Sequence, residues 1–267
     1  MTSVADLVKR PVSWLHSPGA RHGIVVSSRI RLARNSLTHG FQRTLSRTRQ
    51  QDLVSHLLGR ITQATSWKDA WSLDMGRLDE IERQALTERQ LISRELAAGK
   101  RPGAAYGSAD ERFALMINEE DHLRLQVIAA GLSLDDNLRL AQELDRTLEQ
   151  RLSWAVHPRF GYLSACPTNT GTGLRASVML HLPALAETQD LKAVLRGLGK
   201  LHMVVRGLHG EGSEASGHFY QVSNQRSLGR TEEEFVAEIN EAVQAIAGHE
   251  ELARAALLTH HRWRLED

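Results

Sequence analysis

Several features that define common protein classes are rare or missing in this sequence of 267 residues. It has one cysteine, which excludes a disulfide framework and a zinc site built from cysteines. No apolar run reaches the roughly 18 residues of a membrane span, and the first ten residues lack the apolar core of a signal peptide. These absences predict a soluble, cytoplasmic protein that does not act on a membrane.

Charge of one sign is also missing, because 33 basic residues face 32 acidic ones and the net charge is +1. Such a balance argues against a nucleic-acid partner. Lysine is rare: five of the 33 basic residues are lysine and the other 28 are arginine. Genomic composition can explain that bias, but arginine also binds phosphate through a planar, two-pronged donor. The positions of the arginines in the chain decide between genomic composition and phosphate binding.

The familiar nucleotide and metal motifs are absent as well. No G-x-x-x-x-G-K-[ST] segment and no HRD and DFG pair occur, which excludes a P-loop and a protein kinase of the eukaryotic type. His249 and Glu250 lack the second histidine of a zincin helix. Residues 171–176 fit G-x-G-x-x-A, yet they lack the βαβ context of a dinucleotide site.

Apolar spacing predicts strands and helices that intersperse without a regular βαβ alternation, which favours an α+β fold. Gly, Ala and Pro in residues 97–110 predict a surface loop. A capping box of Thr231 and Glu234 predicts the start of a final helix. The expected strands cover residues 23–34, 112–118, 160–164 and 175–182, and the expected helices lie around 53–61, 78–85, 134–152 and 190–201.

Two segments combine arginine or carboxylate with polar turn residues in the first half of the chain. Arg29 and Arg31 share one face of a strand, and two adjacent guanidinium groups repel unless an anion lies between them. Residues 119–121 form a run of three carboxylates behind an apolar strand, with Arg124 close after them. Each segment is either a solvated surface or part of an active site.

Two further segments follow in the second half. A lone cysteine is usually an inert buried thiol, but Cys166 lies in a polar Pro/Thr/Asn/Gly loop that ends at Arg175, and a functional thiolate is the alternative interpretation. Glycines in residues 206–213 leave room near a ligand and separate Arg206 from Glu211 by five residues. An ordinary hairpin loop is the alternative interpretation of that segment.

In order and in residue detail, the four segments resemble signature loops of the guanidino (phosphagen) kinase family. They read SSRIRLARN, NEEDHLR, CPTNTGTGLRAS and RGLHGEGSE. The flanking sequences GYLSACPTNTGTGLRASVMLHLPAL and YQVSNQRSLG are most similar to the bacterial protein-arginine kinase branch. This resemblance covers roughly residues 20–265 and implies an α+β catalytic domain with a large antiparallel β-sheet flanked by helices.

The resemblance implies transfer of the ATP γ-phosphoryl group to a guanidino nitrogen of arginine residues in proteins. Glu120 and Glu211 match the pair of substrate-binding glutamates, one of which is the general base. Cys166 matches the cysteine that contacts a non-reacting guanidino nitrogen. The nucleotide-binding positions implied in the same way are Ser27, Ser28, Arg29, Ile30, Arg31, Arg124, Arg175, Ala176, Ser177, Val178, Met179, Arg206, Gly207, Leu208, His209 and Gly210.

The same resemblance implies Mg²⁺, held mainly through the nucleotide phosphates. No dedicated carboxylate cage is visible, and Glu119 is at most a water-mediated partner of the ion. A zinc-finger activator and the Clp protease machinery are implied as partners. One position departs from the family pattern, because Gln90 stands where a histidine usually lies near the adenine.

The domain organisation that we predict is a short N-terminal segment, residues 1–26, and a catalytic domain, residues 27–267, without the family's C-terminal domain. The short segment cannot form the helical domain that closes over small acceptors, which favours an arginine displayed on a protein. An acidic rim of Glu119, Asp121 and Glu214 is expected to attract such substrates. Two alternatives remain: a phosphagen-type kinase acting on free arginine or another small guanidino compound, and a non-catalytic module that binds ATP or phosphoarginine.

Overall fold

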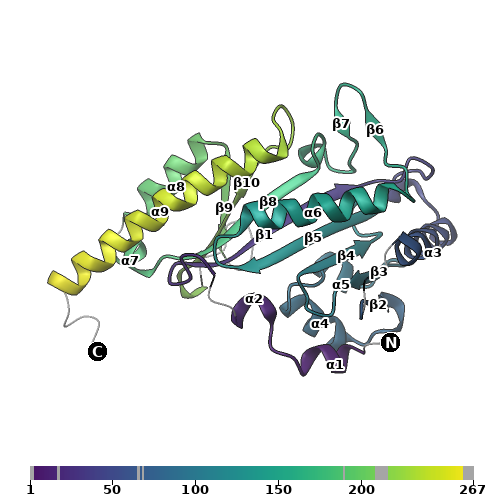
Figure 1. The fold of residues 1–267 in the computed structure, drawn as a ribbon, viewed down its shortest axis with the longest axis horizontal. Helices are drawn as coiled ribbons and strands as arrows, with labels where there is room; N and C mark the ends of the chain where they lie inside the picture. Colours follow the sequence, from purple (N-terminus) through teal and green to yellow (C-terminus); the bar gives the residue numbers. More distant parts are fainter. Residues whose placement is uncertain are drawn as a thin grey trace.

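An eight-stranded antiparallel sheet organises the protein (Figure 1). The computed structural model describes residues 3–16, 19–64, 67, 69–188, 190–207 and 216–260. A separate two-stranded hairpin, β6 (Val156–His157) with β7 (Gly161–Tyr162), projects from the sheet. The strands of the large sheet, in spatial order, are β2 (Trp71–Asp74), β3 (Ala104–Gly107), β4 (Phe113–Ile117), β5 (Leu123–Ala130), β1 (Val25–Arg34), β8 (Leu174–His181), β10 (Phe219–Asn224) and β9 (Met203–Gly207).

Helices lie on both sides of this sheet, and four single-turn 3-10 segments connect elements. The described α-helices are α1 (Val4–Val8), α2 (Ser13–His16), α3 (Arg47–Ala64), α4 (Glu80–Glu88), α5 (Arg94–Ala97), α6 (Leu134–Glu149), α7 (Pro183–Glu187), α8 (Leu191–Lys200) and α9 (Glu232–His260). The 3-10 segments are η1 (Gln42–Thr44), η2 (Met75–Arg77), η3 (Pro167–Asn169) and η4 (Ser216–His218). No helix in this part of the chain is long and apolar enough to cross a bilayer.

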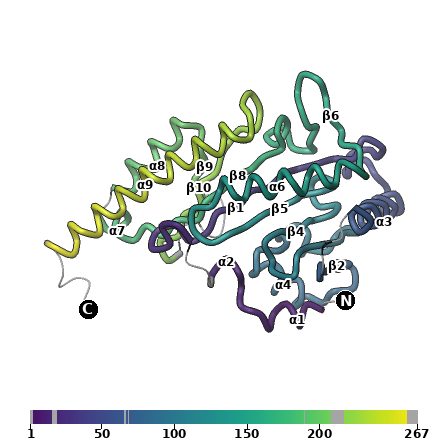
Figure 2. Tube along the Cα trace, viewed as in Figure 1, coloured from purple at the N-terminus to yellow at the C-terminus, as the bar shows by residue number. Residues whose placement is uncertain are grey.

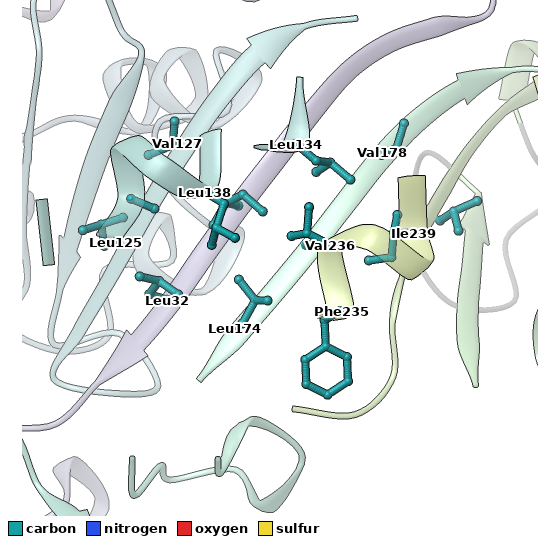
Figure 3. Close-up of a cluster of buried hydrophobic side chains, with 14 of the residues drawn as sticks. Leu32, Leu125, Val127, Leu134, Leu138, Leu174, Val178, Phe235, Val236 and Ile239 are labelled. Atoms are coloured by element: carbon teal, nitrogen blue, oxygen red, sulfur yellow. The ribbon is translucent and has the colours of Figure 1, made fainter. Parts of the chain in front are cut away.

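One face of the sheet carries the main hydrophobic core, which α6 and α9 cover (Figure 1). The buried apolar residues of α6 recur every three or four positions and form one stripe against the strands: Leu134, Leu138, Ala141, Leu144 and Leu148. Leu32 of β1 and Leu174 of β8 lie together with Leu138 of α6 and Val236 of α9 (Figure 3). Because side chains alternate along a strand, this packing turns the residues between the core positions toward the opposite face.

The opposite face is covered at one end by a second apolar cluster. Residues of α1, α4 and α5 pack there against β2, β3 and β4, with Trp71, Met75 and Leu86 fully buried. The N-terminal chain follows α4 before α2 reaches β5 and β1 (Figure 2). The middle of this face, formed by β1, β5 and β8, is where the described helices leave an open cleft.

The predicted α+β fold is confirmed, and so is the capping box, in which Glu234 and Thr231 exchange hydrogen bonds of 2.8 and 3.2 Å.

The predicted loop at 97–110 is wrong in part, because Ala104–Gly107 forms strand β3 between β2 and β4. Small residues suit that position, since any larger side chain at Gly107 would meet the Trp71 ring. The helix around 78–85 begins at Glu80, and Ile81 is 78% exposed rather than part of the buried stripe.

Candidate active site

A cleft of about 700 Å³ lies over the middle of the sheet. It brings together residues from all four of the segments that the sequence analysis identified. Two of these residues, Arg29 and Gly207, are 178 positions apart in the sequence. The predicted site residues that line it are Arg29, Arg31, Glu120, Arg124, Cys166, Arg175, Arg206 and Gly207.

Strand register places the arginines side by side. Arg31 of β1 lies opposite Arg175 of β8 and opposite Gln126 of β5. Arg124 is opposite Ala33, two residues from Arg31, so it points to the same face. Arg206 joins from the sheet edge, where its β9 position pairs with Gln221 of β10. The arginines therefore converge because of pairing between strands, which sequence spacing alone does not encode.

The side chain of Arg29 donates its hydrogen bonds to two neutral glutamines. Arg29 donates to Gln90 Oε1 at 3.0 Å and to Gln221 Oε1 at 3.2 Å. Arg31 Nε is buried without a hydrogen-bond partner in the described residues. Burial, together with the charges of Arg124 and Arg175, lowers the pKa of Arg29 to about 10, and burial with the neighbouring arginines lowers the pKa of Arg31 well below its usual value. An anion in the cleft would relieve both penalties.

The three carboxylates of residues 119–121 have different environments. Glu119 is buried, accepts a hydrogen bond of 2.6 Å from Ser93 and pairs with Arg124 Nη1 at 2.7 Å. The Glu120 side chain is 34% exposed and lies 3.5 Å from Arg124 Nη2. Burial raises the pKa of Glu120, which Arg124 opposes and Asp121 and Glu119 reinforce. Glu120 is therefore the carboxylate that faces the cleft with an increased affinity for a proton.

Asp121 connects this carboxylate segment to the cysteine loop. Its Oδ1 accepts hydrogen bonds of 2.7 Å from both Asn35 Nδ2 and the Ala165 backbone, and Ser164 Oγ donates to the same carboxylate. The predicted acidic rim is wrong for Glu119 and Asp121, because both are buried and engaged inside the protein. Glu214 lies outside the described residues.

Cys166 lines the cleft and is half-buried, which excludes an inert position in the hydrophobic core. Its Sγ lies 3.0 Å from Thr168 Oγ1, and its backbone N–H donates to Ser164 Oγ at 3.3 Å. Because Asp121 binds both Ser164 and Ala165, the position of the thiol is fixed relative to Glu120. A planar ligand with N–H donors could contact the carboxylate and the sulfur together.

Some of the residues predicted to bind nucleotide do not present their side chains to the cleft. Ile30, Ala176 and Val178 belong to the core on the other face, because they alternate with the cleft residues along β1 and β8. Ser28 Oγ is fully buried and hydrogen-bonds the Gly131 carbonyl and the Ser133 N–H. These four residues can contact a ligand through their backbone alone.

The remaining predicted positions divide into two groups. Ser27, Ser177 and Met179 line a second pocket of about 210 Å³ that shares Arg29, Gln90 and Gln221 with the cleft. The other predicted residues, Leu208, His209, Gly210 and Glu211, lie outside the described residues.

The cleft also contains residues that sequence reasoning missed. Arg43 of η1, Arg94 of α5 and Arg101 add three more cations to the lining. No motif contains them, and the excess of arginine over lysine was the one signal that could have indicated them. Gln221 lies inside the segment YQVSNQRSLG that carried the resemblance, but nothing in the sequence marked it as a partner of Arg29.

Divalent cations have few protein ligands in this cleft. No group of three His, Cys, Asp or Glu side chains suited to a metal occurs in the part of the chain that the structure describes. Glu119 and Glu120 lie in the cleft, but both face Arg124, so neither is a dedicated ligand. These donors fit an ion that is brought by phosphate oxygens and is touched by a carboxylate through water.

Comparison with known proteins gives a consistent result. The family model described as ATP:guanido phosphotransferase, C-terminal catalytic domain, matches residues 51–253. A protein-arginine kinase of Shouchella clausii is 40% identical over 99% of this chain and 75% of its own length. A protein-arginine kinase of Moorella thermoacetica is 43% identical over 97% of this chain and 75% of its own.

Solved structures agree in fold. The duplicated taurocyamine kinase of Schistosoma mansoni with bound transition state analog components superposes with a TM-score of 0.76 at 27% identity. That match covers 93% of this chain, which spans 35% of the duplicated protein. A lombricine kinase superposes with a TM-score of 0.76 over 92% of this chain and 72% of its own, at 21% identity, and supports the fold alone.

Proposed function

This chain belongs to the ATP:guanido phosphotransferase family, and we propose that it transfers the γ-phosphoryl group of ATP to a guanidino nitrogen of arginine residues in proteins. One observation carries the proposal: arginines from four segments converge on one cleft, with Glu120 and Cys166 in its lining. Neither an ordinary solvated surface nor a core would place so many like charges together without an anionic ligand.

The arginines would act on the phosphates. Arg31, Arg124 and Arg175 lie side by side on the sheet, and each guanidinium can donate two parallel hydrogen bonds to phosphate oxygens. Because sheet pairing fixes their backbones, they can hold the triphosphate for in-line attack with little reorganisation. When bound between the phosphates, Mg²⁺ would neutralise part of the charge that develops on the transferred group.

The carboxylates and the thiol would act on the acceptor. The acceptor guanidinium has a pKa above about 12, so its nitrogen must lose a proton to attack. The nitrogen lone pair forms a bond to the γ-phosphorus, the bond from that phosphorus to the bridging oxygen breaks, and ADP leaves with the electron pair. We assign the departing proton to one of the two predicted glutamates, Glu120 or Glu211. Glu120 suits this role because burial raises its pKa.

A protein acceptor is supported by the names of the relatives that are 40–43% identical. It is also supported by the hairpin β6–β7, which stands away from the sheet (Figure 1). Strand β7 ends at Tyr162, four residues before Cys166. Val156 and Phe160 of this hairpin are 53% and 41% exposed. Apolar side chains at that place could hold the backbone of a substrate protein beside the cleft.

Mass spectrometry and kinetics test the proposal together. Incubation of an arginine-rich protein with the chain and Mg-ATP should produce phosphoarginine, and kcat/KM for that protein should exceed the value for free L-arginine. Phe160→Ala should lower kcat/KM for the protein acceptor and leave turnover of free arginine unchanged. Equal or faster turnover of free arginine would favour the small-molecule alternative, and no phosphoarginine from either acceptor would favour the non-catalytic module.

Partners and location are further parts of this proposal. The zinc-finger activator and the Clp protease machinery implied by the resemblance stay predictions, and so does the cytoplasmic location. The division into residues 1–26 and 27–267 also stays a prediction. Copurification of the chain with candidate activators, compared with and without Zn²⁺, would test the first of these.

A further inference from the structure

Arg34 is the third arginine of the segment SSRIRLARN, and the proposed reaction gives it no role. Because side chains alternate along β1, Arg34 points away from the cleft, to the core face that it shares with Ile30 and Leu32. Its side chain is 1% exposed. A buried ion pair adds little net stability, because lost hydration offsets much of the attraction. This burial therefore favours a role in fixing one arrangement of the chain.

The guanidinium of Arg34 is bound both along its edge and on its flat face. Nε and Nη2 donate to Asp145 Oδ2 of α6 at 2.9 and 2.6 Å, and Glu232 at the start of α9 lies 3.6 Å from Nη2. Nη1 donates to the carbonyl oxygen of Thr172 at 2.9 Å. The ring of Tyr162 lies on the flat face, with 3.5 Å from Cζ to the ring centroid. One planar group therefore connects β1 with two helices, with Tyr162 and with Thr172.

Tyr162 and Thr172 are the two ends of the loop that carries Cys166 into the cleft. Next to these ends, the backbone N–H of Tyr162 donates to the Gly171 carbonyl at 2.7 Å, and the N–H of Gly171 donates back at 3.2 Å. Arg34 contacts one end through an aromatic ring and the other through a carbonyl oxygen. The guanidinium thus closes the base of the loop, whose middle projects to the thiol.

Two further features keep this contact in place. Gly173 leaves room for the guanidinium, because a Cβ there would lie 2.6 Å from both Arg34 Nη1 and the Ala33 carbonyl oxygen. The Tyr162 hydroxyl donates to Glu149 Oε1 of α6 at 3.0 Å. Burial raises the pKa of this hydroxyl to about 12, so it keeps its proton at neutral pH and remains a donor. Both partners of the stack are therefore fixed by the fold.

We propose that Arg34 is a positioning residue for the acceptor site: it closes the loop of residues 162–172 and thereby sets the place of the Cys166 thiol. The proposal rests on the proposed function, in which this thiol contacts the acceptor guanidinium. Strand β1 then positions both halves of the reaction, because Arg29 and Arg31 of the same strand line the phosphate side of the cleft. The separation between the thiol and the phosphates is accordingly fixed by one strand.

Tyr162 is the position at which the closure can be tested without exposing or unpairing a buried charge, since Arg34 keeps its bond to Asp145. Tyr162→Leu removes the ring from the guanidinium, whereas Tyr162→Phe keeps the ring and loses the hydroxyl. For an arginine-bearing protein, kcat/KM should fall about fivefold in Tyr162→Leu, which corresponds to roughly 1 kcal/mol for one cation–π contact. Tyr162→Phe should lose less than about twofold, and neither variant should change the affinity for Mg-ATP by more than that.

A double-mutant cycle separates positioning of the thiol from a general structural role. If Tyr162 acts through the thiol, Tyr162→Leu should cost less than about twofold in kcat/KM when Cys166→Ala is already present. The same fivefold loss in both backgrounds would overturn the proposal, because it would mean that the ring contributes independently of the thiol. Such additivity is also the result expected if the hairpin alone had been disturbed.

Hydrogen exchange of the full chain measures the closure of the loop without reference to activity. The backbone N–H groups of Leu163, Asn169 and Thr172 are hydrogen-bonded and report on opening of the loop. Tyr162→Leu should speed their exchange about fivefold, while amides of α3 remain unchanged and show that the fold is intact. Unchanged exchange at all three positions would overturn the proposal.

Phe160→Leu is the matched control for exchange, because it removes the other aromatic ring of the same hairpin that lies under an arginine. Arg159 is 5.4 Å from that ring, and neither residue closes the loop. Exchange at the three reporter amides should therefore stay as in the wild type. If the wild type forms no phosphoarginine, the proposed function fails and the acceptor role of Arg34 fails with it, whereas the exchange result still decides whether Arg34 closes the loop.

Discussion

Replacing Arg31 with methionine should make the ligand-free protein more stable and its complex with ATP weaker. Arg31 is surrounded by Arg29, Arg124 and Arg175, and its Nε has no hydrogen-bond partner in the described structure. Methionine keeps an unbranched side chain of similar length while it removes the charge. The substitution therefore tests whether the cluster is built for a ligand or for the fold.

The magnitude follows from the geometry of β1. Two residues on the same face of a strand are separated by about 7 Å, and two like charges at that distance repel by roughly 2 kcal/mol at an effective dielectric constant of about 20. Arg124 and Arg175 add repulsion, while Glu119 offsets part of it. We expect the free energy of unfolding of the ligand-free variant to rise by about 2 kcal/mol. A lost charged hydrogen bond to phosphate costs about 1.5–3 kcal/mol, which corresponds to at least a tenfold loss of affinity.

Urea unfolding with and without Mg-ATP measures both effects, provided that the slope of the transition is unchanged. Saturating ATP should stabilise the wild type and should stabilise Arg31→Met much less. Arg139→Met is the matched control, because Arg139 is 77% exposed on α6 and pairs with Asp136. A variant that is less stable than the wild type without ligand, and that binds ATP as tightly, would refute the argument.

Four further outcomes are expected. Glu120→Gln should lower kcat by on the order of 10²–10⁴ with little change in ATP affinity, as for a lost general base. Burial raises the pKa of Glu120 above its usual 4.5, so the acidic limb of kcat/KM should lie above that pH. The free energy of unfolding of the ligand-free protein should fall as the pH rises through the same range, because ionisation of the half-buried Glu120 is unfavourable. Glu120→Gln should remove this pH dependence of stability. Cys166→Ser should reduce activity without loss of ATP binding, and alkylation of Cys166 should be slower when acceptor is bound. A non-hydrolysable ATP analogue should increase the affinity for the acceptor, by about 5- to 150-fold if the coupling is of ordinary size, and equilibrium binding that is independent of nucleotide would contradict this.

Parts of the fold could be predicted because local pattern and tertiary environment agree. Residues 29–32 alternate charged and apolar side chains after a β-branched run, and β1 is an inner strand of the sheet whose two faces differ in that way. The spacing of Leu53, Leu57 and Ile61 predicted an amphipathic helix, and helix α3 buries these three residues. Strand β3 was missed, because its small residues make sense only beside Trp71 on the neighbouring strand.

The candidate site was predictable where a motif contains the residue and unpredictable where only packing brings it in. Arg43, Arg94 and Arg101 belong to short turns and helices, and their approach to the cleft depends on how those elements pack. Glu119 looks like an exposed acid in the sequence, yet Ser93 and Arg124 bind it in the interior.

Charge balance links the two halves of the proposed reaction. Eight arginines and three glutamates line the described cleft, so an acceptor that carries a positive guanidinium is repelled from the ligand-free protein. The salt bridge of Glu119 to Arg124 leaves Glu120 as the more exposed carboxylate for that acceptor. Bound Mg-triphosphate would cancel part of the excess positive charge, and the same carboxylate would then face a less positive cleft. If the arginines destabilise the free protein as proposed, acceptor binding should depend on the nucleotide, and the guanidinium should enter only when a phosphoryl group is ready to be transferred.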